Sequence, residues 1–406
     1  MSTPAGSAST PLRGPLGPPR IGVTLRRGEL VSPLELLFDL VFVLAITQCT
    51  ALMAADPTWA GIGRGLLVLG LLWWSWVGYA WLTSVMDPDE GPVRFVLFAA
   101  MAALLVTSLC VPGAFGDLSL IFAASYGAVR AAHIALFVLA SRDDAGLRHS
   151  VAGLAASTAI GVGILLAGSQ LDGGARTAVW ATALLLDMAG PLFIDPSGWR
   201  LIPGHFAERH GLIVIVALGE SIVAIGVGAG AGVDGGVIAA AVLGMAVACA
   251  QWWAYFDVTA PAAARRLAEL EPVGVRNRLA RDAFSYLHLP MVAAIVLVAL
   301  GMKTTLAHVG DPLGWETAAA LVGGVALYLL THVAFKLRVL GTLSGHRLVA
   351  ALVLLAFIPF SHRLEPLLTV GVVAAVLWLS FFLEAIHHAE SRRAIREAEH
   401  LRHSGD

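Results

Sequence analysis

Apolar residues occur along most of the chain in runs of about twenty, and short stretches rich in charged residues, proline and glycine separate them. A helix needs about 20 predominantly apolar residues to cross the roughly 30 Å hydrocarbon core of a bilayer. The pattern therefore predicts an all-α membrane protein with about twelve transmembrane helices. The expected spans are residues 33–55, 61–85, 94–112, 117–140, 149–169, 176–195, 207–231, 235–258, 282–303, 316–338, 346–361 and 365–387.

The composition agrees with this pattern. Of 406 residues, 58% are hydrophobic and only 13% are charged, whereas soluble domains carry about 25% charged residues. The arginines are scattered through short loops and form no basic face, which argues against a nucleic-acid partner. Cys49, Cys110 and Cys249 all fall in apolar runs, so neither a disulfide framework nor a thiolate metal site is expected.

Positive charges are distributed unevenly between the two sets of loops. With a cytoplasmic N-terminus, the outside loops hold only Arg64, Arg176, Lys303 and Arg363. This asymmetry predicts that both termini are cytoplasmic and that the number of spans is even. Residues 1–30 are rich in Pro, Gly and Ser and lack the apolar core of a signal peptide, so a disordered cytoplasmic tail is expected there. Residues 389–406 are expected to form a charged cytoplasmic tail.

The two halves of the chain resemble each other. Glu35 opens the first predicted helix as Glu208 opens the seventh, and on that register Thr47-Gln48 matches Glu220-Ser221. Further matches in the same order are Trp73-Trp74-Ser75-Trp76 with Trp252-Trp253-Ala254-Tyr255, Arg94 with Arg281, Tyr126 with Tyr328, and Arg148-His149 with His346-Arg347. Six helices in each half make the repeats parallel, as in transport proteins whose site lies where the halves meet. The expected organisation is a first six-helix repeat at 31–195, a linker at 196–206 and a second repeat at 207–388.

Glu220 is expected deep in the membrane. At a rise of 1.5 Å per residue, the stretch from Glu208 to Glu220 covers roughly 18 Å, which reaches about the middle of the bilayer core. A carboxylate at that depth is unfavourable unless it is paired, protonated or facing water, so it indicates a functional site. The alternative is a protonated Glu220 that hydrogen bonds to a neighbouring helix as part of the scaffold.

A second pair of carboxylates opens the first helix. Ser32 and Glu35 fit a capping box with Pro33 at the first helical position, which gives Glu35 a structural explanation beside a functional one. Asp39 follows four residues later on the same face, already inside the apolar run. Two ionised carboxylates at this spacing repel, so one should be protonated or the two should share a cation. We expect a proton or cation relay at the cytoplasmic mouth.

Arg130 is the one basic residue expected in mid-span, and His133 follows three residues later on the same face. A buried guanidinium cannot neutralise itself and needs a carboxylate partner. The candidates are Asp187, Glu220 and Asp39, and depth favours the first two. The pair is either a static link between helices or a switch, in which Arg130 binds an anionic substrate in place of the carboxylate. Ser221, next to Glu220, is a further candidate for the relay.

A charged segment lies between the predicted repeats and contains His205, Glu208, Arg209 and His210. Glu208, Arg209 and His210 are expected at a water-facing helix start. The order H-x-x-E-x-H differs from the zincin motif, which has two histidines at i and i+4. His205 and Glu208 share a face, but His210 is turned by about 140° from Glu208. Gating contacts or stabilisation of the helix start are therefore favoured over metal binding, and no cofactor is expected.

Two segments resemble the most characteristic blocks of the bacterial low temperature requirement A proteins: SPLELLFDLVFVLAITQ and HFAERHGLIVIVALGESIVAIG. The resemblance extends over about residues 28–388. It implies a multipass protein of the bacterial inner membrane but supplies no reaction. The motif residues that carry over are Glu35, Phe38, Asp39, His205, Glu208, Arg209, Gly219, Glu220 and Ser221.

These features predict a proton-coupled transporter in which Glu220 and Asp39 exchange protons while Arg130 and Asp187 form a switchable pair. Its expected partners are the lipid bilayer and an unidentified small solute or ion, including protons. A channel of two six-helix repeats is an alternative that needs a continuous wet path, usually in a homo-oligomer. A membrane-embedded enzyme that uses His205, Glu208 and His210 is a second alternative, and a non-catalytic scaffold or sensor is a third. The sequence contains no nucleotide-binding loop.

Overall fold

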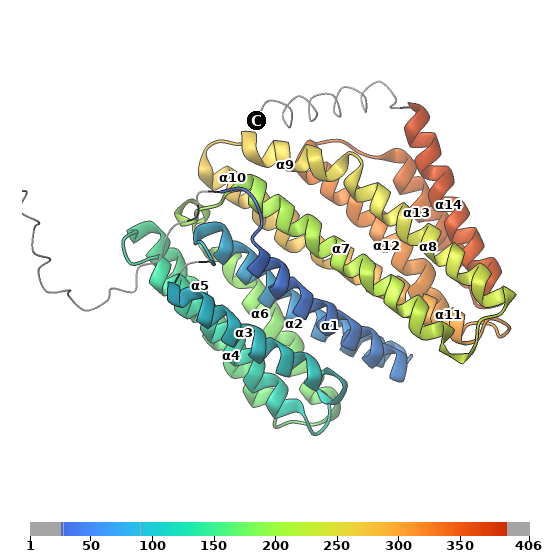
Figure 1. The fold of residues 1–406 in the computed structure, drawn as a ribbon, viewed down its shortest axis with the longest axis horizontal. Helices are drawn as coiled ribbons and strands as arrows, with labels where there is room; N and C mark the ends of the chain where they lie inside the picture. The colour runs from blue at the N-terminus through green and yellow to red at the C-terminus, as the bar shows by residue number, and fades with distance from the viewer. Residues whose placement is uncertain (1–25, 27, 90, 388–406) are drawn as a thin grey trace, which may run out of the picture.

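The computed structural model describes residues 26, 28–89 and 91–387, and this part of the chain is built from helices (Figure 1). The first half contains α1 (Pro33–Ala55), α2 (Trp59–Val85), α3 (Gly91–Cys110), α4 (Ser119–Ala140), α5 (Ala145–Gly168) and α6 (Gly173–Phe193). After the short helix η2 (Pro196–Gly198), the second half contains α7 (Pro203–Gly228), α8 (Gly235–Phe256), α9 (Thr259–Glu269), α10 (Val273–Leu279), the π-helical turn η4 (Ala280–Tyr286), α11 (His288–Ala307), α12 (Trp315–Leu340), α13 (Gly345–Ser361) and α14 (Pro366–His387). The predicted C-terminal tail and nearly all of the predicted N-terminal tail lie outside the described residues.

Each predicted span overlaps one helix of the structure, and the span predicted at 282–303 begins in η4 and continues into α11. In the described part of the chain, ten helices are long and apolar enough to cross a membrane. Two of the expected spans are not among them: α13 has only 17 residues, and α6 carries Arg176 and Asp187, which lower its hydropathy. The protein is therefore a multipass membrane protein, and the count of twelve spans remains a prediction.

Two short helices, α9 and α10, lie in a region where the apolar pattern predicts only a loop. In α9, Ala263 and Leu267 are buried and stand four residues apart, on one face of the helix, whereas Arg266 is exposed. An amphipathic helix of 11 residues is too short to span a membrane. A search for long apolar runs therefore does not detect α9.

The start of α1 forms as its sequence predicts. The backbone N–H of Glu35 donates to the Ser32 hydroxyl at 3.3 Å, and the backbone N–H of Ser32 donates to the Glu35 carboxylate at 2.9 Å. These reciprocal bonds complete the capping box, with Pro33 at the first position of the helix. The cap fixes the position of the Glu35 side chain in the first turn of α1, and the same side chain is part of the candidate site.

The helices of the two halves pack on their neighbours in the same order. In the first half, α1 packs against α2 and α3, α2 packs against α4 and α6, and α3 to α6 pack in sequence. In the second half, α7 packs against α8 and α11, α8 packs against α12 and α14, and α11 to α14 pack in sequence. The halves meet where α1 and α2 lie beside α7 and α11 (Figure 1).

The linker between the halves is held by both of them. Asn277 of α10 donates its Nδ2–H groups to the carbonyl oxygens of Pro196 and Trp199, at 2.8 Å each. Arg200 forms an ion pair of 2.7 Å with Asp144, the residue that caps α5. A backbone N–H in the first turn of α5 lowers the pKa of Asp144 below its usual range, and Arg200 adds to this shift. The linker therefore has a fixed path along the ends of these helices.

Candidate functional site

Five ionisable side chains meet between α1 and α7, and we call them the inner ionic cluster: Arg26, Glu35, Asp39, His205 and Arg209. Arg209 donates to Glu35 Oε1 at 3.0 Å and to Asp39 Oδ1 at 2.8 Å. Arg26 donates to the other oxygen of Glu35 at 2.9 Å. Glu35, Asp39 and Arg209 are only 1–3% exposed. The two carboxylates thus share a cation, one of the two arrangements that their spacing predicts, and the cation is Arg209.

Helix α2 completes this cluster. The indole N–H of Trp76 donates to Asp39 Oδ1 at 2.8 Å. The ring of His205 contacts Glu35 Oε1 through Nε2 and the Ser84 hydroxyl through Nδ1, at 2.9 Å each. Two guanidinium groups balance two carboxylates, so a proton on His205 would give the buried cluster a net positive charge. The second oxygen of Asp39 is buried without a hydrogen-bond partner among the described residues, which leaves room for one more proton or water.

The expectation of a water-facing start for α7 is wrong for most of its ionisable residues. His205, Arg209 and His210 are buried, and Glu208 alone is exposed. The reason is that α1, α2 and α9 pack against α7 and cover one face of its first turns. His205, Glu208 and His210 therefore do not converge on one point. Within the described ranges, no group of three or more His, Cys, Asp or Glu side chains is arranged to hold a metal ion.

Glu220 lies in α7, roughly 16 Å along the helix from Arg209. It is 2% exposed, and its carboxyl group hydrogen bonds with the hydroxyl of Thr47 on α1. Among the described residues it forms no ion pair, and the neighbouring Ser221 hydroxyl is buried without a partner. A carboxyl group in such surroundings is stable only while it is protonated or hydrated. Glu220 is therefore not the partner of Arg130, and its carboxyl group needs a proton or water to be stable where it lies.

Arg130 forms a buried ion pair with Asp187, which links α4 to α6 at 2.9 Å. Arg130 also donates to the carbonyl oxygen of Trp74 at 3.2 Å and to the Thr158 hydroxyl at 2.6 Å. The prediction that Arg130 needs an intramembrane carboxylate is confirmed, and Asp187 is the partner among the three candidates. Helix α5 packs closely against α6 because Gly161 of α5 faces Asp187 of α6. A Cβ added at Gly161 would lie 3.1 Å from the Asp187 Cβ.

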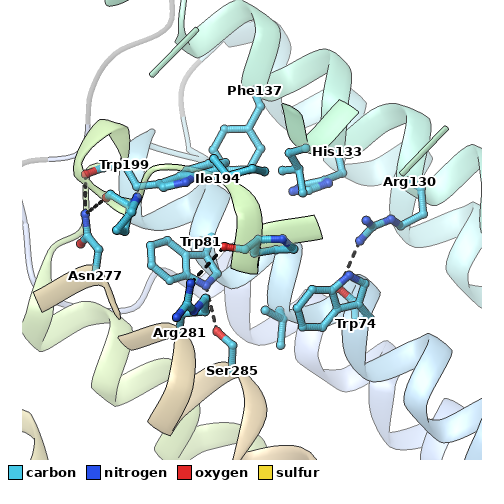
Figure 2. Close-up of a pocket in the computed structure, with 15 residues that line it drawn as sticks. Trp74, Trp81, Arg130, His133, Phe137, Ile194, Trp199, Asn277, Arg281 and Ser285 are labelled. Carbon is cyan, nitrogen blue, oxygen red and sulfur yellow. Dashed lines mark hydrogen bonds between the residues drawn. The ribbon is translucent and has the colours of Figure 1, made fainter. Parts of the chain in front are cut away.

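A pocket lies beside this pair, between the first half, the linker and the α10–η4 segment of the second half (Figure 2). Its walls are aromatic: Trp74 and Trp81 come from α2, Phe137 from α4 and Trp199 from the linker. The ring centroids of Phe137 and Trp199 lie 5.3 Å apart, and those of Trp81 and Trp199 lie 6.0 Å apart. The pocket holds about 600 Å³ of space between side chains, part of it open to solvent.

Several polar atoms at this pocket have no partner. Arg130, His133 and Trp74 lie at one end, and Trp199 and Asn277 lie at the other (Figure 2). Both ring nitrogens of His133, the Arg130 Nε and the Trp74 Nε1 are buried without a hydrogen-bond partner in the described part of the chain. Buried polar groups are nearly always hydrogen-bonded in native structures. These atoms are therefore candidates for hydrogen bonds with a bound molecule.

The sequence singles out Arg130 and His133 but not the other residues of this pocket. Trp74 and Trp81 stand seven residues apart and so share a face of α2, which is a usable signal. What they face depends on the return path of the linker, which brings Trp199 against Trp81. The contributions of the second half, among them Asn277 and Ser285, carry no sequence signal of their own.

Gly78 lets α2 approach α4 at the pocket. An added Cβ at Gly78 would lie 2.8 Å from Cε1 and 2.9 Å from Nε2 of His133. The substitution Gly78→Ala is therefore expected to displace the imidazole and to destabilise the protein by about 1–3 kcal/mol, the usual range for overpacking. Thermal unfolding in detergent measures this loss. Gly163→Ala, with open space around its Cβ, is the matched control and should preserve or raise stability. Equal unfolding temperatures for the two variants would contradict the close contact.

Most of the chain is similar to known proteins. Residues 30–382 match the family model described as bacterial low temperature requirement A protein (LtrA). One similar relative is the uncharacterized protein RA0937 of Rhizobium meliloti (strain 1021), which is 30% identical over 307 residues, or 73% of this chain and 74% of the relative. No solved structure matches the chain. The matched range includes the Arg130–Asp187 pair, the pocket and all of the inner ionic cluster except Arg26.

Proposed function

The chain belongs to the bacterial low temperature requirement A family of multipass membrane proteins, and from this premise we propose that it is a transporter of the inner membrane that moves a small solute together with protons. The observation that carries the proposal is the aromatic pocket, which lies between the two halves beside the buried Arg130–Asp187 pair. Sites of this kind, mostly apolar with a few converging polar groups, are the usual form of small-molecule sites.

The proposed architecture is a pair of parallel six-helix repeats. It is supported by the order in which the helices pack on one another, which is the same in both halves. It is also supported by the hydrogen bond between Thr47 and Glu220, whose separation of 173 residues equals the offset between Glu35 and Glu208. Matched positions on α1 and α7 would lie side by side in this way near an axis along the membrane normal. Transporters commonly place their site at such a repeat interface.

Proton coupling rests on the groups that surround α2. Trp76 on this helix donates to Asp39 of the inner ionic cluster, while Trp74 and Trp81 line the pocket. The Trp74 carbonyl oxygen accepts a bond from Arg130. One helix therefore contacts both a group of titratable side chains and the proposed solute site. A ligand and a proton that favour different positions of the same helix are coupled thermodynamically.

The proposed orientation places the inner ionic cluster, α9 and α10 on the cytoplasmic side, with both termini inside. It follows from the concentration of arginine in the loops at these helix ends. A channel would need a continuous wet path, whereas α1 and α7 contribute buried apolar side chains such as Phe42 and Ile213 to the core. The enzyme alternative requires His205, Glu208 and His210 to act together. It is less favoured because His205 contacts Glu35 of α1 while Glu208 is exposed.

Replacing Glu220 with glutamine is expected to abolish proton flux in proteoliposomes under an imposed membrane potential. The amide keeps the shape of a protonated carboxyl group and can still hydrogen bond with Thr47, so the thermal unfolding temperature should change little. Glu208→Gln makes the same chemical change at an exposed position of the same helix and should keep the flux. Wild-type flux that persists in the Glu220 variant would overturn the assigned proton path. A variant that loses stability together with flux would make Glu220 a scaffold group.

A further inference from the structure

The charged side chains that line the pocket are cationic. Among its described lining residues, Arg130 and Arg281 carry charges, and no aspartate or glutamate is present. Their counterions lie outside the pocket wall: Asp187 pairs with Arg130, and Asp282 pairs with Arg281 at 2.8 Å. A ligand in the pocket therefore faces guanidinium groups directly and carboxylates only from a distance.

The unpaired polar atoms are mainly hydrogen-bond donors. Arg130 Nε and Trp74 Nε1 can only donate, and neutral His133 supplies one donor and one acceptor. Arg130 is 1% exposed and His133 is fully buried, so bulk water does not hydrogen bond with either side chain. Unpaired donors beside a guanidinium fit a carboxylate, whose oxygens accept hydrogen bonds and which brings the opposite charge.

Much of the remaining pocket wall is aromatic. Beyond His133, the rings of Phe137, Trp199 and Trp81 follow one another toward the linker, with centroids 5.0 Å apart from His133 to Phe137 and 5.3 Å from Phe137 to Trp199. Phe137, Trp199 and Trp81 contact one another and all line the pocket, so a planar apolar group can pack against their pocket-facing surfaces. Aromatic walls also attract cations, but a cationic ligand would be repelled by the two guanidinium groups.

We infer that the pocket binds a small monoanionic carboxylate with a flat apolar body. The carboxylate lies at the end formed by Arg130, His133 and Trp74, and the apolar body lies between Trp81, Phe137 and Trp199. This inference rests on the proposed function, since it names the solute class of the same site. It does not require transport, because binding can be measured by itself.

The test uses three probes that share a phenyl ring and differ in charge: phenylacetate, phenylacetamide and phenethylammonium. Binding to the purified full chain is measured by titration calorimetry. Phenylacetate is expected to bind about tenfold or more tighter than either of the other probes, since hydrogen bonds to a charged group contribute about 1.5–3 kcal/mol. Trp199→Leu should weaken phenylacetate binding several-fold through loss of stacking. The control Trp59→Leu, at an exposed tryptophan that does not line the pocket, should leave it unchanged.

The outcomes separate this inference from the proposed function. Equal binding of the amide, or tighter binding of the ammonium probe, would overturn the anionic class. Absence of binding by all three probes, with Glu220-dependent proton flux intact, would also overturn it while the transporter stands. Tight binding of phenylacetate that weakens in Trp199→Leu supports the inference even if no flux or uptake is found, and in that case the transporter proposal fails instead.

Discussion

Replacing Arg209 with methionine is expected to lower the free energy of unfolding by about 3–5 kcal/mol, the usual loss when one member of a buried ion pair is removed. The substitution keeps an apolar stem of similar length and removes the cation that Glu35 and Asp39 share. Glu35 would retain Arg26 and His205, but Asp39 would retain only the indole N–H of Trp76. Two buried carboxylates four residues apart would then repel. Denaturant unfolding in mixed micelles measures the change.

Two further variants show whether the effect comes from the buried charge. Arg200→Met makes the same chemical change in an exposed ion pair with Asp144 and should lower stability by less than about 1 kcal/mol. Asp39→Asn in the Arg209→Met background removes the unpaired charge and should recover much of the loss. The role of Arg209 as the shared cation would be wrong if its variant were no less stable than Arg200→Met.

Local sequence signals predict part of this cluster correctly. The capping box fixes the start of α1, and the spacing of Glu35 and Asp39 requires a shared cation or a protonated partner. The same signals do not identify Arg209, because a charged residue in the first turns after a linker ordinarily faces water. Here α1, α2 and α9 cover that face, and the cover depends on tertiary packing of segments distant in sequence.

The other buried pair is more predictable than the pocket beside it. A guanidinium in mid-membrane must meet a carboxylate, and few carboxylates reach that depth, so depth limits the favoured partners of Arg130 to Asp187 and Glu220. The structure shows that the partner is Asp187. The pocket offers no such rule. Transmembrane helices are apolar on all faces, so hydrophobic periodicity does not show which face of α2 meets the linker. Trp199 belongs to the wall because Asn277 of α10 and Asp144 of the first half hold the linker in place.

Asp187→Asn is the second change with a large expected effect. It leaves Arg130 buried and charged, with only the Thr158 hydroxyl, a carbonyl oxygen and a neutral amide as neighbours. A guanidinium cannot lose its proton to escape this state. The expected loss is about 3–5 kcal/mol in the free energy of unfolding. The double variant Arg130→Met/Asp187→Asn removes both charges and should regain most of that stability, since a neutral pair needs no counterion.

The double variant also decides between a static link and a switch. If Arg130 leaves Asp187 to bind the carboxylate of a solute, the double variant should fold but lose phenylacetate binding and solute-dependent proton flux. Lys336→Met removes a cation from an ion pair in the second half, on α12, where Glu384 keeps Arg347 at 2.9 Å. It should retain both activities. A double variant that binds and transports like the wild type would assign Arg130 and Asp187 to the scaffold. In that case His133 and Trp74 alone would be the donors at their end of the pocket. Discrimination between phenylacetate and its amide would then come from neutral hydrogen bonds, which are roughly half as strong as hydrogen bonds to a charged group.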